Sequence, residues 1–326
     1  MPTTTTPVDR SVLPLQPFAP DSIWRREIAA DATYVDISDV TADPEKAIDT
    51  VGLELVTLCS TDASAPLVNI ERGNGWTPEQ RAVTTGEVLY QRHLSPDACS
   101  DVTFNPIGNG LFVLFDPETG TADLGIGGYR VPGGPLLNSA GDGRDAHGLD
   151  VFDGDGLIGY GRASLLPALG GLLRAGELDN GIDHALAVNL PTGMLSKTQH
   201  FVWPARAADG TADITYQGNN PALAMGTLLA IPRTVDLDSL TWRTPQGRVL
   251  AEAAQRYGWY VVDVLLPAHK VQLGMDPVAA RSDLGFGYDP ATGHETVDPA
   301  KVDAVGLAAD VAQIASLLRA VPQATR

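Results

Sequence analysis

The sequence lacks the features that mark membrane proteins. No stretch approaches the roughly 20 consecutive apolar residues that a membrane-spanning helix needs. The opening residues, MPTTTTPVDRSVLPLQPFAP, have neither the basic start nor the apolar stretch of a signal peptide. We therefore expect a protein that is synthesised in a cytoplasm and undergoes no membrane insertion.

Basic residues are also scarce. The 22 lysines and arginines are outnumbered by 40 aspartates and glutamates, which gives a formal net charge of -18 at pH 7. Such a surface repels the phosphate backbone of nucleic acid and an anionic membrane alike. We therefore expect no nucleic acid among the partners of this protein.

Cysteine occurs only twice, as Cys59 and Cys99. Their separation matches no metal-binding spacing, and the sequence alone does not show whether the two residues pair. Free thiols are the usual state in a chain that carries no mark of secretion. We therefore expect two free thiols, with pairing left open.

The short motifs of common active sites are missing as well. No pair among the six histidines has the i, i+4 or H-x-H spacing of a zinc site. The glycine-rich stretch GYGRASLLPALGGLLRAGEL, residues 159–178, contains no G-x-S-x-G and no Walker A loop. These absences argue against nucleotide binding and leave a zinc site without support.

The chain does contain many turn-forming residues. It has 34 glycines and 24 prolines, 44% hydrophobic residues and only 19% charged residues. This composition predicts a globular, mostly-β fold, either a β-sandwich or a jelly roll, with a few accessory helices. Residues 1–20, rich in threonine and proline, predict an extended arm, and residues 21–326 predict a single β-rich domain that ends in a helix.

Three segments carry helix signals. Aspartate followed by proline is typical of a helix start and predicts a short helix over residues 43–55. Residues 243–258 have the strongest pattern, with Thr244 in the N-cap position and Gly258 just beyond the end. A final helix is predicted from Asp298 onward, and we expect it to pack as a terminal cover.

Strand signals follow the same turns. Residues 111–115 and a turn at 116–120 predict a hairpin with a return strand. Further strands are expected over 184–190, 199–206, 224–232 and 259–267. Between these groups, eleven of the 41 residues from 141 to 181 are glycine, which predicts a long loop of the kind that often carries a site.

The first part of this loop contains several aspartates. Asp150, Asp153 and Asp155 resemble a calcium loop, because a hard cation takes several carboxylate oxygens from one flexible turn. The regular spacing with a closing glutamate is missing, and a solvated acidic turn explains the same residues. We therefore expect no required cofactor, with calcium as the one metal that the pattern admits.

His184 raises the sharpest question. Alternation along the predicted strand places it with Ile182, Leu186 and Val188 on a face that packs into a core. A buried imidazole without a partner loses about 1–3 kcal/mol, so a specific group must face it. That group is either a structural partner or part of a site, and the sequence leaves both interpretations open.

The site interpretation groups several polar residues into a cleft for sugars or uronates. Its catalytic candidates are Arg162, Glu177, His184 and Asp263, because cleavage of a glycosidic bond needs paired carboxyl groups or a basic set for β-elimination. Its substrate-binding candidates are His200, Trp203 and Arg206, of which Trp203 would stack on a sugar ring. A turn carboxylate at Glu177 and a core tryptophan at Trp203 are the competing structural interpretations.

Several segments together resemble a known family. They are LQPFAPDSIWRREIAADA near the start, LLPALGGLLRAGEL, GIDHAL, FVWPA, AMGTLLAIP and RVLAEAAQRYGWYVVD. These segments are similar to a poorly characterised β-sandwich domain found in secreted bacterial proteins and in minor tail proteins of tailed bacteriophages. The family motif usually has asparagine after the tryptophan, whereas Arg25 follows Trp24 here. The resemblance implies that His184, Trp203 and Tyr257 are family positions, and it adds Tyr257 to the substrate-binding candidates.

The resemblance also implies a setting. We expect a minor tail protein in the virion, at the distal end of a phage tail, whose partners are other tail proteins and a glycan of the host envelope. The alternative is a carbohydrate-active enzyme, a hydrolase or lyase acting on cell-surface polysaccharide, in a secreted protein. Homo-oligomer formation is left open.

Overall fold

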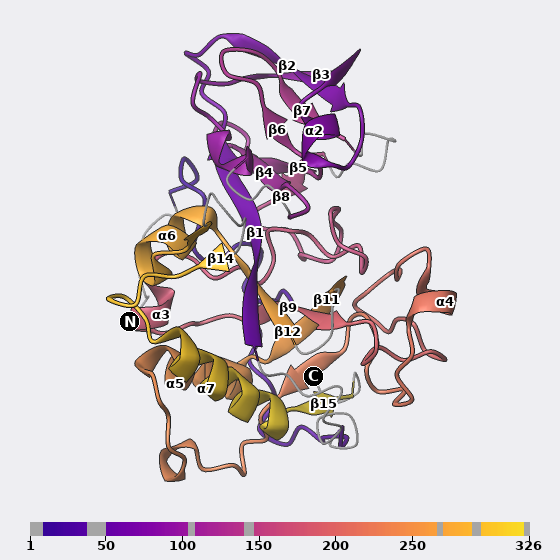
Figure 1. The fold of residues 1–326 in the computed structure, drawn as a ribbon, viewed down its shortest axis with the longest axis vertical. Coiled ribbons are helices and arrows are strands. Elements are labelled where there is room, and N and C mark those ends of the chain that lie inside the picture. The colour runs from indigo at the N-terminus through magenta and orange to yellow at the C-terminus, as the bar shows by residue number, and fades with distance from the viewer. Residues whose placement is uncertain are drawn as a thin grey trace, which may run out of the picture.

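A nine-stranded mixed sheet organises the molecule, which we describe from a computed structural model (Figure 1). The structure describes residues 9–37, 50–103, 108–139, 147–265, 270–288 and 295–322. The strand order in the large sheet is β15-β10-β11-β9-β12-β1-β4-β5-β8, and a second sheet has the order β3-β2-β7-β6.

The strands are short apart from β1 and β3. They are β1 (Thr50–Ser60), β2 (Leu67–Gly73), β3 (Thr84–His93), β4 (Leu111–Asp116), β5 (Thr121–Gly125), β6 (Tyr129–Arg130), β7 (Leu136–Asn138), β8 (Leu149–Asp150), β9 (Leu186–Pro191), β10 (Leu228–Ala230), β11 (Trp259–Leu265), β12 (Lys270–Met275), β13 (Gly287–Tyr288), β14 (Glu295–Thr296) and β15 (Arg319–Val321). The helices are α2 (Pro78–Arg81), α3 (Glu177–Asn180), α4 (Ala212–Thr215), α5 (Pro245–Arg256), α6 (Pro277–Leu284) and α7 (Ala304–Leu317), with 3-10 turns η1 (Ser100–Thr103) and η2 (Leu237–Ser239). None of the helices described is long and apolar enough to cross a bilayer.

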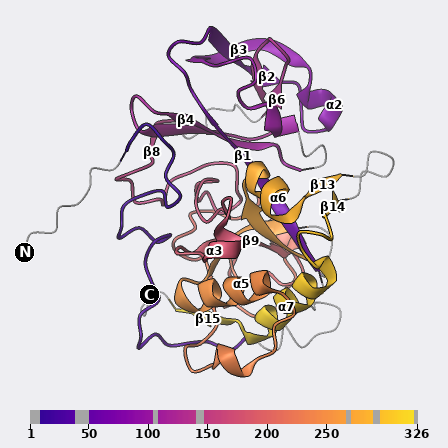
Figure 2. The ribbon, with the colours of Figure 1, turned by 90° about the vertical axis from the view of Figure 1, so that its left-hand side faces the viewer.

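Strand β1 joins the two halves of the large sheet. Its first half pairs in parallel with β12, and its second half, from Val56 to Ser60, pairs in parallel with β4. Figure 1 and Figure 2 show the four-stranded sheet at one end of the molecule and helices α5 and α7 at the other, with β1 running between them. The half of the sheet around β9, β11 and β12 therefore lies next to the helices.

Each face of the large sheet has its own core. Helices α5 and α7 pack on one face, where Leu250 and Val311 meet Val188, Val261 and Leu273 of the strands. The opposite face is covered by loops that include residues 166–172 and by the N-terminal segment, which inserts Phe18 and Trp24. Because both faces are covered, β4, β9 and β11 are buried at nearly every position and not only at alternate ones.

The four-stranded sheet packs against β4. Phe112 and Leu114 of β4 contact Ile70 and Leu136 of the smaller sheet, while alternate residues of β4 face the other core. The mostly-β prediction is confirmed, since strands in sheets outnumber the few helices. The sandwich or jelly roll stays a prediction.

The prediction of free thiols is wrong. Cys59 at the end of β1 and Cys99 before η1 form a disulfide across 40 residues. Cys99 also belongs to the apolar cluster between β4 and the four-stranded sheet. The fold brings the two residues together through the pairing of β1 with β4, a contact that spacing in the sequence does not reveal.

Several local predictions are confirmed. Strands β4 and β5 form the predicted hairpin, and α5 begins at the predicted cap, where the Thr244 side chain accepts a hydrogen bond from the Gly247 amide. Gly258 follows the helix with φ of 81°, a left-handed conformation that favours glycine. Of the other predicted strands, 184–190, 224–232 and 259–267 contain β9, β10 and β11.

Three local predictions fail in part or whole. Residues 199–206 form a loop with one isolated bridge, between Phe201 and Met225, because Pro204 has no amide hydrogen for a strand ladder. The predicted helix over 43–55 lies outside the described residues up to 49, and its remainder is strand β1. The final helix begins at Ala304 with Asp303 as its cap, since Asp298 instead accepts the Ala300 amide in a turn.

The described part of the predicted arm, residues 9–20, contains no helix or strand. It lies on the domain through side chains: Phe18 is buried, its amide donates to the Val151 carbonyl, and Gln16 donates to the Asp183 carbonyl. These residues form turns and bends that contact the domain, and the extended arm over residues 1–20 stays a prediction.

Candidate functional site

Four polar side chains form a row across the large sheet. They are Glu54 on β1, Gln272 on β12, Asn189 on β9 and Asp263 on β11. The residues that flank Glu54, Gln272 and Asn189 pack into the core under α5 and α7, so these three side chains point to the opposite face. In β11, Val264 packs against the same core, whereas Val262 belongs to the core on the opposite face. Asp263 lies opposite Asn189 and Asn189 opposite Gln272, with a register shift in β11 that brings Asp263 into this row.

Arg162 lies over this row. Its guanidinium is fully buried and approaches Glu54 from Nε and Nη2, each at 3.1 Å from Oε2. Its Nη1 donates to the carbonyls of Pro167 and Gly170, which fixes the loop to the sheet. A Cβ at position 274 would lie 2.9 Å from Nη2, so Gly274 lets the guanidinium lie directly on the strand.

Asp263 has no comparable cation. Asn189 donates to Glu54 Oε1 at 2.9 Å, so both Asn189 and Arg162 satisfy Glu54. Asp263 is 8% exposed, and its Oδ1 accepts only the Val264 amide. Burial and the neighbouring Glu54 carboxylate raise the pKa of Asp263 well above its ordinary range.

Asp209 and Tyr216 lie on the other side of Asp263. Both residues interact electrostatically with it. The Tyr216 hydroxyl donates to Asp209 Oδ2 at 3.1 Å, and burial raises the pKa of Asp209 while this hydrogen bond opposes the rise. Burial and the Asp209 carboxylate also raise the pKa of Tyr216, so its hydroxyl keeps its proton. All three groups lie where the parallel strands β9 and β11 end and a long loop begins.

That loop carries three of the predicted substrate-binding residues. His200, Trp203 and Arg206 lie on it within seven residues of one another. The Arg206 amide donates to the Ser164 carbonyl, and the Ser164 amide donates to Val262 of β11, so the loop is held close to the sheet edge.

The aromatic side chains of this loop are accessible. Trp203 is 38% exposed and Phe201 is 43% exposed. His200 contacts the Tyr216 ring edge-on at 5.7 Å and lies 3.6 Å from Asp213. The interpretation of Trp203 as a fully buried core residue is therefore wrong, because the loop that carries it does not form the expected strand.

Glu177 and His184 meet in a different place. His184 is buried, its Nδ1 lies 2.9 Å from the Ala185 carbonyl, and its Nε2 lies 3.1 Å from Glu177 Oε1. Both ring nitrogens of His184 therefore have a hydrogen-bond partner inside the protein. The structural partner that the sequence requires for His184 is therefore Glu177.

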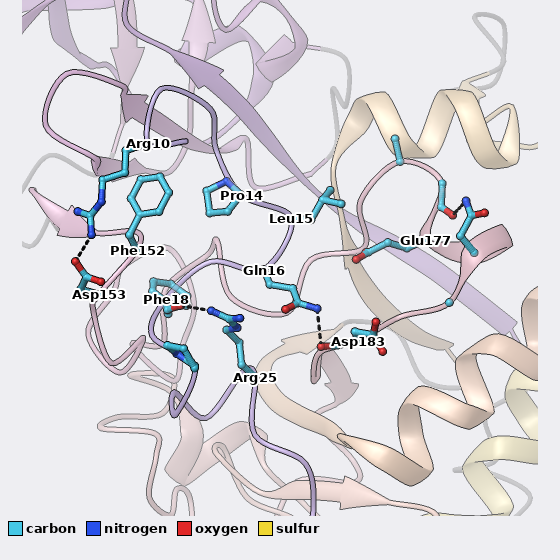
Figure 3. A pocket seen from close by; sticks show the side chains of 15 residues that line it. Arg10, Pro14, Leu15, Gln16, Phe18, Arg25, Phe152, Asp153, Glu177 and Asp183 are labelled. Atoms are coloured by element: carbon cyan, nitrogen blue, oxygen red, sulfur yellow. Dashed lines mark hydrogen bonds and ion pairs between the residues drawn. The ribbon is translucent and has the colours of Figure 1, made fainter. Parts of the chain in front are cut away.

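Glu177 also lines a pocket of about 640 Å³ beneath the N-terminal arm (Figure 3). Figure 3 shows Gln16 reaching Asp183 and Arg25 reaching Phe18 across this pocket. Glu177 Oε2 accepts a hydrogen bond from the Arg174 amide at 2.8 Å, which helps to fix the position of the carboxylate. His184 does not line the pocket, and we describe it as a residue that positions Glu177.

The predicted catalytic set is thus divided. Arg162 and Asp263 belong to the polar row, whereas Glu177 and His184 pair with each other, and no hydrogen bond or ion pair joins the two groups within the described part of the chain. Tyr257 is buried beside Arg256, whose guanidinium lies 4.9 Å from its ring centroid, and Asp183 is its hydrogen-bond neighbour. It lies near the pocket beneath the arm and not with Trp203.

The three aspartates of the predicted calcium loop have local partners. Asp150 Oδ1 accepts the amides of Phe152 and Asp153, Asp155 accepts the Leu157 amide, and Asp153 pairs with Arg10. Within the described ranges no three such residues are grouped as metal ligands. Calcium stays a prediction.

Sequence reasoning missed four members of the site: Glu54, Asn189, Asp209 and Tyr216. Glu54 and Asn189 each interrupt an apolar strand, LELV in β1 and AVNL in β9, and a polar residue flanked by buried ones is a usable signal. Asp209 lies in an Asp-Gly turn and Tyr216 lies in a polar stretch, so the sequence around these two residues gives no such signal.

Comparison with family models, with curated proteins and with solved structures finds no match.

Proposed function

We propose that the protein binds a cell-surface glycan at the loop of residues 199–216. The observation that carries this proposal is the exposure of Phe201 and Trp203 on a loop that also carries Arg206 and Asp209. Aromatic faces stack on sugar rings, while carboxyl and guanidinium groups bind hydroxyls. Exposed aromatic side chains on a loop that also carries such polar groups suit a carbohydrate ligand.

We propose the distal tail of a phage as the setting, with other tail proteins and the host envelope as partners. The resemblance of the sequence segments supports it, and so does the disulfide between Cys59 and Cys99, since disulfides persist on virion and cell surfaces. The alternative is a secreted glycan-binding protein, which the sequence resemblance and the disulfide support equally. For the fold, we propose that the packing of the four-stranded sheet on β4 is the sandwich that the family resemblance implies.

A retention experiment tests the glycan proposal. The protein is passed over immobilised host-wall polysaccharides, and Trp203→Ala is compared with Trp76→Ala. The control variant removes another exposed tryptophan (51%), which lies just before helix α2 in the part of the molecule that holds the four-stranded sheet (Figure 1). We expect Trp203→Ala to weaken retention at least tenfold and Trp76→Ala to leave it unchanged. Equal behaviour of the two variants, or no retention of the unmodified protein, contradicts the proposal.

The tail proposal has its own test. Sedimented virions, stripped of loosely attached protein, should contain this chain by mass spectrometry. Its absence from virions that still adsorb to the host ends the tail proposal but not the glycan proposal.

A further inference from the structure

We propose that the pocket beneath the N-terminal arm binds a small acidic sugar, a hexuronate. This site is separate from the loop of residues 199–216, because none of the residues that line the pocket belongs to that loop. Binding of a hexuronate there therefore does not depend on the glycan function proposed above. Glu177 is a binding residue in this pocket, and His184 positions it.

Two walls enclose the pocket, and they come from distant parts of the chain (Figure 3). One wall is the arm, through residues between 14 and 20, and the other consists of residues 175–183 together with Phe152. The volume of about 640 Å³ suits a small molecule, since ligand sites usually measure roughly 300–1,000 Å³. Pro14, Leu15 and Phe152 supply apolar surface beside the polar groups, which is the mixed lining of a small-molecule site.

The arm is fixed at two points of this wall. The Arg174 guanidinium donates to the Pro14 carbonyl at 3.3 Å, and the Phe18 amide donates to the Val151 carbonyl at 2.5 Å. The Phe18 side chain is itself buried in the core. Both walls are therefore in place before a ligand enters, which reduces the entropy that binding costs.

Arg25 supplies the charge that selects an acidic ligand. Each carboxyl group that lines the pocket has a basic partner: Asp153 pairs with Arg10, Asp183 with Arg256 and Glu177 with His184. Arg25 differs, because its guanidinium donates to the Phe18 carbonyl at 2.9 Å and pairs with no carboxylate in the described part of the chain. A guanidinium binds a carboxylate through charge-assisted hydrogen bonds, often two at once. The half-buried Arg25 therefore favours a ligand that carries a carboxylate.

The polar groups opposite Arg25 accept hydrogen bonds. Glu177 is buried, and its oxygens keep lone pairs for a ligand in addition to the bonds from His184 and from the Arg174 amide. Gln16 on the arm uses its Nε2 to donate to the Asp183 carbonyl at 3.0 Å, so its Oε1 is left as an acceptor. A ligand must therefore offer hydrogen-bond donors to both walls.

A hexuronate combines these properties in one small molecule. Its carboxylate matches Arg25, its hydroxyls donate to Glu177 and Gln16, and the C–H groups of its ring contact Leu15 and Phe152. An amino acid also has a carboxylate, but its one ammonium group lies directly beside it. The acceptors lie on both walls, so a ligand with hydroxyls around a ring fits them better.

Equilibrium titration of the full chain with three probes tests the choice of ligand. Glucuronate should bind at millimolar concentration or below. Glucose, which lacks the carboxylate, should bind at least about tenfold more weakly, the size of the contribution of a hydrogen bond to a charged group. Glutamate should also bind more weakly than glucuronate. No binding of glucuronate, equal binding of glucose, or tighter binding of glutamate overturns the proposal.

Two neighbouring arginines provide a matched pair of variants. Arg25→Gln removes the cation of the pocket, whereas Arg26→Gln removes an exposed cation that does not line it. We expect Arg25→Gln to weaken glucuronate binding about tenfold or more and Arg26→Gln to leave it unchanged. Equal effects of the two variants contradict the role of Arg25. Melting temperatures confirm folding, and if Arg25→Gln does not fold, Gln16→Ala decides, because it removes an acceptor on the arm and should weaken binding.

The variant Trp203→Ala distinguishes this proposal from the glycan function of the 199–216 loop. It should bind glucuronate as tightly as the unmodified protein does. Loss of glucuronate binding in Trp203→Ala places the ligand at the loop and overturns the pocket proposal. Failure of the unmodified protein to be retained on polysaccharides, with glucuronate binding intact, overturns the glycan proposal alone.

Discussion

Removing the disulfide between Cys59 and Cys99 should destabilise the protein by an amount that the sequence separation sets. The bond closes a loop of 40 residues. Loop closure removes entropy from the unfolded chain in proportion to the logarithm of loop length, which for this loop gives about 4 kcal/mol at 25 °C. We therefore expect Cys59→Ser/Cys99→Ser to lower the free energy of unfolding by about 4 kcal/mol.

Guanidinium unfolding of the double variant and of the unmodified protein measures this difference. For a chain of 326 residues, the same free energy corresponds to a melting temperature lower by about 6 °C. Adding a reductant provides the control, because it should reproduce the shift in the unmodified protein and leave the double variant unchanged.

The loss should also be local. Cys99 packs with Ile70 and Leu136 between β4 and the four-stranded sheet, so amide exchange should rise in β2, β3 and β7 before it rises in β9 or β11. Equal stability with and without the bond would refute the reasoning, because it would mean that the 40-residue loop is already constrained in the unfolded chain.

Three further predictions concern buried polar groups. Arg162→Met leaves Glu54 buried without its cation and should lower the free energy of unfolding, measured in urea, by about 3–5 kcal/mol. The double variant Arg162→Met/Glu54→Gln should regain much of this loss. A loss below about 1 kcal/mol in Arg162→Met contradicts the pairing. His184→Gln should lower stability by about 1–3 kcal/mol, since it removes the bond to Glu177, and should leave glycan retention unchanged; loss of retention in a fully stable variant would return His184 to the site. The pKa of Asp263 is raised above the ordinary 3.8, so its contribution to stability is fully present below that pH and is lost as pH rises. Asp263→Asn should therefore be more stable than the unmodified protein at pH 7 but not at pH 3. An equal difference in the free energy of unfolding between the two proteins at both pH values contradicts the shift.

Much of the local structure could be predicted from the sequence because its causes are local. Helix α5 follows from Thr244, Pro245 and Gly258, and the β4–β5 hairpin follows from its turn residues. The strand predicted over 199–206 failed because hydrophobic content was weighed above Pro204, which removes a ladder hydrogen bond. A short apolar run shows that a segment can be buried, but it does not show whether a neighbouring strand is available to pair with it.

The composition of the site could be predicted only in part. Arg162 and Asp263 were identified by residue type, yet Glu54, which pairs with Arg162, lies 108 residues away from it in the sequence, and no local pattern indicates that contact. Glu177 and His184 are seven residues apart and were expected to line one cleft with Arg162 and Asp263. Instead, the short segment between them lets the two side chains bond to each other. Closeness in the sequence therefore did not indicate which polar residues share a site, because the contacts of Glu54 with Arg162 and Asn189 join distant parts of the chain.

The charges of the polar row explain why two of its carboxyl groups behave differently. Arg162 and Asn189 both donate to Glu54, and these bonds offset the desolvation of the buried side chains. Arg162 is bonded to Glu54, whereas Asp263, one row position beyond Asn189, has Glu54 and Asp209 as negative neighbours and only a smaller, opposing interaction with Arg162. A chain selected for stability alone would place an apolar or amide side chain there, because a buried carboxyl without a partner destabilises the fold above its ordinary pKa. The buried carboxyl group of Asp263 therefore lowers the stability of the fold as pH rises, and the amide of Asp263→Asn removes that loss.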